Sequence, residues 1–92
     1  MRIEFDEQKS AKNERERGLP FWFAQLFDFD SAFVIEDRRH AYPEPRYVAT
    51  GFIGERLYVM CFTPLRDSIR VISLRKANKR EVKVYGEKAA DR

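Results

Sequence analysis

The chain is poor in residue types on which several protein classes depend. Its 92 residues include one cysteine, one histidine and four glycines. The single cysteine, Cys61, excludes a disulfide within the chain, and its apolar neighbours indicate a small buried side chain and not a nucleophile. No cysteine or histidine spacing is typical of a metal site, and no glycine-rich phosphate or dinucleotide loop is present. We therefore expect an activity without a metal or other cofactor.

Long apolar runs are also absent from the sequence. No stretch approaches the roughly 20 residues of a membrane-spanning helix, and the opening residues 1–6 do not form a signal peptide. The sequence therefore predicts a cytoplasmic protein with no membrane partner. The length allows one domain, residues 1–92, and a hydrophobic fraction of 43% is sufficient for a packed core.

Positive charge is concentrated near the C-terminal end of the sequence. Between Arg66 and Lys83, seven Lys or Arg residues stand against Asp67 and Glu81, which gives this segment a net charge of +5. The whole chain carries only +3, so the remaining residues sum to −2. A basic surface of this kind is typical of proteins that bind phosphate groups, RNA included. A solvated helix face would have the same composition.

The hydrophobic pattern predicts an α+β fold in one antiparallel meander, with the helices packed on one face of the sheet. Strands are expected at Arg2–Phe5, Ala32–Glu36, Arg46–Phe52, Leu57–Thr63 and Ile69–Leu74. Helices are expected at Lys9–Arg17, Phe21–Phe27 and Lys76–Glu87. Asp6 suits the N-cap of the first helix, and Gly18 suits its C-terminal end. The second helix is so rich in aromatic residues that we expect most of it to be buried.

Alternation along the last expected strand assigns its side chains to the two faces of the sheet. Arg70 should share a face with Ile72 and Leu74. The opposite face should carry Ile69, Val71 and Ser73. On the helix that follows, basic side chains recur at spacings of three and four residues and should form one stripe: Lys76, Lys79, Arg80 and Lys83.

Three segments with chemically useful side chains converge if the meander forms: the polar loop before the third strand, that strand itself, and the last strand with its helix. Arginine suits bidentate contact with phosphate. Cleavage of RNA through its 2′-hydroxyl also needs a base and an acid. Glu44 and Glu81 are the candidate bases and His40 is a weaker one, although a carboxylate among cations can equally be a structural ion pair. Tyr42 is one of the tyrosines that could stack on a nucleobase.

The segment Ile72–Glu81, with the sequence ISLRKANKRE and followed by Tyr85, resembles the C-terminal signature of the BrnT ribonuclease toxins. Similar positions run through the rest of the chain: Ile3–Asp6, Lys12, Asn13, Gly18, Tyr42, Glu44, Arg46, Gly51, Gly54, Arg56, Leu57, Thr63 and Arg70. Two positions depart from the family pattern, because Arg17 replaces a frequent histidine and Pro43 replaces a loop glycine.

This resemblance implies a RelE-like toxin fold and metal-independent cleavage of RNA that inhibits translation. It also implies a hetero-oligomeric complex with a cognate BrnA-type antitoxin. In this interpretation three arginines clamp the scissile phosphate and one of two carboxylates accepts the proton, so the catalytic residues are Glu44, Arg46, Arg70, Arg75 and Glu81. Residues that bind the rest of the RNA are Lys76, Lys79, Arg80 and Tyr42.

Two other functions fit the same sequence. The basic segment could belong to a non-catalytic RNA-binding module, and the apolar segment Phe21–Phe27 could dock a protein partner. Cleavage of RNA in the presence of a metal chelator separates a toxin from the RNA-binding module. A neighbouring reading frame for a small helical antitoxin would support the pairing.

Overall fold

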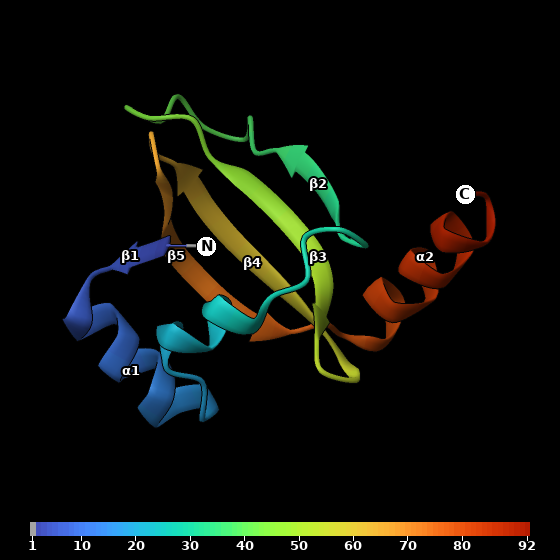
Figure 1. Cartoon of the computed structure of the whole chain (residues 1–92), viewed down its shortest axis with the longest axis horizontal. Helices are drawn as coiled ribbons and strands as arrows, with labels where there is room; N and C mark the ends of the chain where they lie inside the picture. Colours follow the sequence, from blue (N-terminus) through green and yellow to red (C-terminus); the bar gives the residue numbers. More distant parts are fainter. Residues whose placement is uncertain (1) are drawn as a thin grey trace.

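The computed structural model describes residues 2–92 as a five-stranded sheet with helices on both faces (Figure 1). The strands are β1 (Arg2–Phe5), β2 (Phe33–Glu36), β3 (Tyr47–Ile53), β4 (Arg56–Pro64) and β5 (Ser68–Lys76). The helices are α1 (Glu7–Arg17), the 3₁₀ helix η1 (Phe21–Leu26) and α2 (Lys79–Ala90). The α+β class and the order of the elements are confirmed. No helix among residues 2–92 has the length and apolar character needed to cross a membrane.

The strands lie in the order β1-β5-β4-β3-β2. Strands β2 to β5 form the expected antiparallel meander, but β1 pairs with β5 in parallel, with Ile3 opposite Ile69. The sheet is therefore mixed, and the prediction of a purely antiparallel sheet was wrong. Residues 6–67 separate β1 from β5, so no short turn dictates the direction of this pair.

A change of register in β5 exchanges the predicted faces of Ser73 and Leu74 relative to Arg70. Ser73 pairs with Cys61, whereas Val71 pairs with the next residue, Phe62. Ile72 is thus one extra residue in β5, as in a β-bulge. Because of this extra residue, Arg70 lies on the same face as Ser73 and Arg75, and not with Leu74 as alternation had predicted.

One face of the sheet, the core face, packs against α1 and η1. Its buried cluster contains Leu19, Phe21, Ala24, Phe27, Ala49, Tyr58, Met60, Phe62, Ile69, Val71 and Leu74. Gly51 also lies here, because an added Cβ would come within 2.7 Å of the Phe27 ring. This face holds most of the buried apolar surface and is the main source of stability.

The aromatic segment is half buried, and not mostly buried as expected. Phe21, Ala24 and Phe27 are buried, but Trp22 and Leu26 are 53% and 60% exposed. A 3₁₀ helix has three residues per turn, so every third side chain faces the sheet and the residues between them face solvent. The pattern expected of an α-helix would have buried a wider stripe.

The opposite face, the α2 face, carries a smaller cluster of Leu57, Val59 and Ala77 with partly buried Val48, Phe52 and Tyr85. Helix α2 contacts this face through Tyr85, whose ring meets the edges of Phe33 and Phe52. None of the residues of α2 is buried, and Figure 1 shows the helix standing away from α1. The helices therefore lie on opposite faces, which corrects the prediction of one helical layer.

Helix α1 is fixed at both ends and at its centre. The Asp6 carboxylate accepts hydrogen bonds from the first turn, and Gly18 ends the helix with a φ of 69°. The Asn13 amide donates to the carbonyl of Leu74 in β5 at 2.9 Å. This cross-link holds α1 against β5, and the basic side chains of α1 therefore have a defined place beside that strand.

Candidate nucleic-acid interface

The α2 face collects arginines from two strands. Arg70 and Arg75 project from β5, and Arg46, which directly precedes β3, shares the side of Val48 by alternation. At about 3.3 Å per residue, Arg70 and Arg75 start roughly 15 Å apart along the strand. The candidate residues consequently form two groups and not a single cluster, and one candidate residue, Lys76, projects to the core face opposite Tyr58.

The first of these, the loop group, contains Tyr42, Glu44, Arg46 and Arg70. Arg70 Nη1 donates to both carboxylate oxygens of Glu44 at 3.1 Å. The Arg46 guanidinium lies 4.2 Å from the centre of the Tyr42 ring. Arg46, Glu44 and Arg70 line one pocket of about 210 Å³ together with Thr63. The structure thus brings together the four predicted residues of this group.

The Arg70–Glu44 pair is open to solvent, with side chains 44% and 47% exposed. Such exposed pairs stabilise a protein by only about 0–1 kcal/mol. An RNA phosphate can therefore replace Glu44 on Arg70 at little cost. The displaced carboxylate would stay beside the phosphate, ready to accept a proton.

Asp37 anchors the loop group and was not identified from the sequence. Its side chain is only 2% exposed and accepts two hydrogen bonds of 2.8 Å from Arg39 and one of 3.1 Å from the Tyr42 hydroxyl. The Arg39 hydrogen bonds hold the pKa of Asp37 well below its usual range. Asp37 also donates its backbone N–H to the carbonyl of Arg46. It therefore fixes Tyr42 under the Arg46 guanidinium.

His40 lies at the exposed end of this loop. Its ring meets the edge of the Tyr42 ring at 5.6 Å. It makes no hydrogen bond or ion pair among the contacts of residues 2–92. The structure therefore adds nothing that would favour His40 over Glu44 as the base.

The second group, the helix group, contains Arg75, Lys76, Lys79, Arg80 and Glu81. Arg75 donates to both oxygens of Glu81 at 2.7 and 2.8 Å. Glu81 also completes a capping box with Asn78 at the start of α2. The Arg75 hydrogen bonds lower the pKa of Glu81 to about 2 and raise the pKa of Arg75.

These bonds limit what Glu81 can do chemically. A general base works best when its pKa lies near the working pH. Glu81 has a pKa far below neutrality, and both of its oxygens already accept hydrogen bonds. Its geometry is that of a residue that positions the Arg75 guanidinium.

The basic stripe predicted for the last helix is not formed. Lys76 ends β5, and α2 begins only at Lys79 after the Asn78 cap. Lys79 lines a hollow with Leu57 on one side of α2, whereas Arg80 lines a cavity on the other side. Consecutive residues point about 100° apart on a helix, so these two cations serve different surfaces.

Helix α1 adds cations that the sequence did not point to. Lys9 lines the loop-group pocket beside Glu44 and Arg70. Lys9 and Lys12 also line a neighbouring hollow with Ser73. Only the tertiary contact of α1 with β5 places these side chains next to the arginines.

A family model described as the ribonuclease toxin BrnT of type II toxin–antitoxin systems matches residues 5–81. The chain belongs to the BrnT family. The match spans both the loop group and the helix group, and the α+β structure fits the family. No curated protein matches the chain at a significant level.

As a BrnT-family toxin, this protein has RNA as its target and an antitoxin as its partner. The arginines of the α2 face are the side chains suited to an RNA backbone. Within residues 2–92, no group of three or more His, Cys, Asp and Glu is arranged to hold a metal ion.

Proposed function

We propose that this BrnT-family toxin has a RelE-like fold and is a metal-independent endoribonuclease that inhibits translation by cutting RNA in the cytoplasm. The observation that carries the proposal is the placement of Arg46, Arg70 and Arg75 on one face of the sheet, beside an exposed carboxylate. Arg46 and Arg70 supply the positive charge that a pentavalent phosphate needs, and Arg75 holds the RNA strand beside it.

In this mechanism Arg46 and Arg70 bracket the scissile phosphate. The phosphate displaces Glu44 from Arg70, and the freed carboxylate takes the proton of the attacking 2′-hydroxyl. The 2′-oxygen forms a bond to phosphorus while the bond to the 5′-oxygen breaks. Solvent water protonates the departing 5′-oxygen, and the resulting hydroxide takes the proton from Glu44, which leaves a 2′,3′-cyclic phosphate and a 5′-hydroxyl end. Lys9 adds positive charge at the same pocket.

The helix group holds the next part of the RNA strand. Arg75 starts roughly 15 Å from Arg70 along β5, so it would contact a phosphate further along the RNA strand than the scissile one. Glu81 keeps the Arg75 guanidinium oriented, and exposed Arg80 contacts a flanking phosphate. Lys76 pairs with Tyr58 and projects from the opposite face of β5, so it would reach RNA only around the end of β5. Lys79, on the other side of α2, would meet RNA only further along the strand.

The decisive experiment is cleavage of a defined RNA by the purified toxin with EDTA present. We expect cyclic phosphate ends, and we expect no cut where the attacking 2′-hydroxyl is replaced by hydrogen. Glu44→Gln should lower the rate while RNA binding is kept. Cleavage that survives the 2′-deoxy substitution, or that EDTA abolishes, would reject this mechanism.

A non-catalytic RNA-binding module is the second candidate. It is favoured by one observation, that both candidate bases are ion-paired. The two functions separate in the same experiment, because a binding module retains RNA at low salt but leaves it intact.

We further propose that a BrnA-type antitoxin covers the basic groups and forms a hetero-oligomer with the toxin. An acidic segment across Arg75 and Arg80 would exclude RNA by occupying its site. The exposed side chains of Trp22 and Leu26 offer a separate apolar anchor. Complex formation should weaken as salt rises, and charge reversal at Lys79 and Arg80 should weaken it further. A complex indifferent to both changes would place the antitoxin elsewhere.

A further inference from the structure

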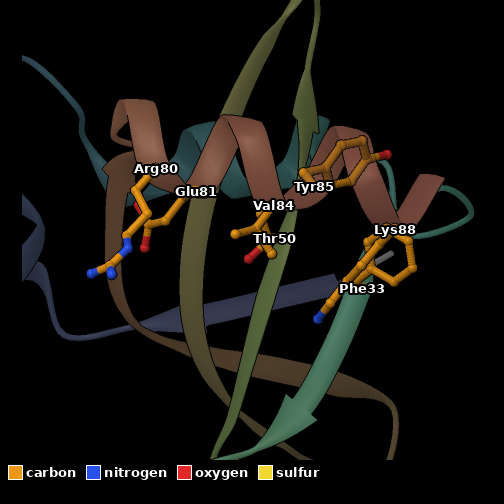
Figure 2. Close-up of a pocket in the computed structure, with 7 residues that line it drawn as sticks. All are labelled: Phe33, Thr50, Arg80, Glu81, Val84, Tyr85 and Lys88. Atoms are coloured by element: carbon orange, nitrogen blue, oxygen red, sulfur yellow. The ribbon is translucent and has the colours of Figure 1, made fainter. Parts of the chain in front are cut away.

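A cavity of about 170 Å³ lies between α2 and the sheet, beside the helix group. Its lining residues are Phe33, Thr50, Arg80, Glu81, Val84, Tyr85 and Lys88. In Figure 2, Val84 faces Thr50 at the centre, Arg80 and Glu81 lie at one end, and Lys88 and Phe33 lie at the other. The space therefore has an apolar middle and a cation at each end.

The size of this cavity suits one flat ring system. At about 30 Å³ per water molecule, 170 Å³ holds roughly five or six waters. Clefts for drug-sized ligands are larger, about 300–1,000 Å³. The cavity is consequently too small for a folded peptide segment and large enough for a single planar group.

Contacts of the lining residues with one another and with residues outside the cavity hold its walls in place. The Tyr85 hydroxyl donates to the carbonyl of Ser31 at 2.7 Å. The Phe33 and Tyr85 rings meet edge to face at 5.2 Å, and Arg92 lies 4.1 Å above the Phe33 ring. Thr50 adds a hydroxyl that can donate to or accept from the edge of a base.

The strand register places this cavity in line with Arg75. Phe33 pairs with Thr50, Thr50 pairs with Val59, and Val59 pairs with Arg75. These residues form one row across four strands on the α2 face. With strands about 4.8 Å apart, Thr50 lies roughly 10 Å from Arg75. Glu81 lines the cavity and also binds Arg75, so it links the two sites.

We propose that the cavity beneath α2 is a subsite for one nucleobase of the RNA, adjacent to a phosphate held by Arg75 and Arg80. This inference rests on the proposed function. The α2 face would then recognise a nucleobase as well as the phosphates of the RNA. Stacking of one base on aromatic side chains strengthens binding by roughly five- to a hundredfold.

The first test is an NMR titration of the purified toxin with the four nucleoside 5′-monophosphates, with ribose 5-phosphate as the probe that lacks a base. We expect at least one nucleotide to bind five times more tightly than ribose 5-phosphate. It should shift the methyl signals of Val84 and Thr50. Equal affinities, or shifts that avoid these methyl groups, would overturn the subsite.

The second test fills the cavity from α2. Val84→Trp occupies it, whereas Val82→Trp places the same side chain on the other side of the helix, where Val82 lines a different hollow. The parent residues are similarly exposed, at 42% and 48%. We expect Val84→Trp to abolish the preference for nucleotides over ribose 5-phosphate, and we expect Val82→Trp to keep it. The same loss in both variants would overturn the proposal.

These experiments separate the subsite from the ribonuclease mechanism. RNA cleavage without nucleotide entry would reject the subsite alone. Nucleotide entry by a toxin that cuts no RNA would reject the mechanism and keep the subsite. Val84→Trp that weakens antitoxin binding but leaves nucleotide affinity unchanged would assign the cavity to a protein partner and overturn the proposal.

Discussion

The two faces of the sheet differ in almost every physical respect. The core face buries aromatic and aliphatic side chains from α1, η1 and the central strands. The α2 face has a small apolar cluster, and the side chains of Arg46, Arg70 and Arg75 stand around it. One face is closed against solvent, and the other is covered only in part, by a helix with no buried residue.

This difference separates stability from function. Apolar burial is concentrated where no RNA contact is proposed, so the core face can hold the sheet rigid. The α2 face can then carry closely spaced positive charges that would be costly in a buried core. Exposed pairs such as Arg70–Glu44 compensate part of this charge.

The largest expected effect comes from a substitution that creates a cavity in the core face. Met60 is fully buried between β3 and β5, and Met60→Ala should lower the free energy of unfolding by about 2–5 kcal/mol. Val82→Ala, on the exposed side of α2, should change it by less than about 0.5 kcal/mol. Urea denaturation measures both. Similar losses in the two variants would mean that α2 contributes to stability as strongly as the core face does.

The next largest effect is expected on the α2 face, and it concerns the rate of RNA cleavage and not stability. Arg75→Ala removes a charge-assisted phosphate contact worth about 1.5–3 kcal/mol, so cleavage should slow by roughly ten- to a hundredfold. Arg46→Ala should do the same, and both proteins should stay folded. Arg66→Ala, which removes one exposed charge from the β4–β5 turn, is the matched control. Rates that are equal in all three variants would show that the arginines of the α2 face are not the clamp.

A smaller effect depends on pH. Arg75 lowers the pKa of Glu81 from 4.5 to about 2, so the unfolded chain takes up this proton more readily than the folded protein. The pair therefore stabilises the fold fully above about pH 4.5, and this contribution is lost as the pH falls towards 2. Glu81→Gln should cost about 1 kcal/mol at neutral pH through the lost ion pair, because glutamine can keep the capping hydrogen bond to Asn78.

Thermal unfolding followed by circular dichroism across this pH range checks the prediction. The difference between the parent and Glu81→Gln should shrink as the pH drops. Glu87→Gln, in the same helix but in no ion pair among residues 2–92, should show no such trend. A constant difference from pH 7 to pH 2 would mean that the charge of Glu81 does not stabilise α2.

The smallest effect is expected from His40. It is exposed in the loop, and its ring meets the edge of the Tyr42 ring. His40→Ala should change cleavage by less than about twofold and stability by less than about 0.5 kcal/mol. A loss of a hundredfold, together with the disappearance of an apparent pKa near 6.5 from the pH–rate profile, would instead make His40 the base.

Local chemistry made much of the fold predictable. Asp6 and Gly18 define the ends of α1 through their own side-chain and backbone preferences. The turn around Gly54, with a φ of 61°, and the alternation of β3 and β4 define the central hairpin. The family resemblance carried by Ile72–Glu81 was confirmed by the match over residues 5–81. The catalytic roles of individual residues remain predictions.

By itself, the sequence determined the strands, the caps of α1, the basic C-terminal segment and the family, because each depends on neighbouring residues or on short spacings. The tertiary structure alone decided that β1 runs parallel to β5 and that α2 covers the face opposite α1. It also decided that the extra residue Ile72 turns Arg70 to the side of Arg75, and that Asp37 is buried beneath the loop group. These features arise from contacts between segments far apart in the chain, and an amphipathic pattern states which side of an element is apolar without stating what that side will meet.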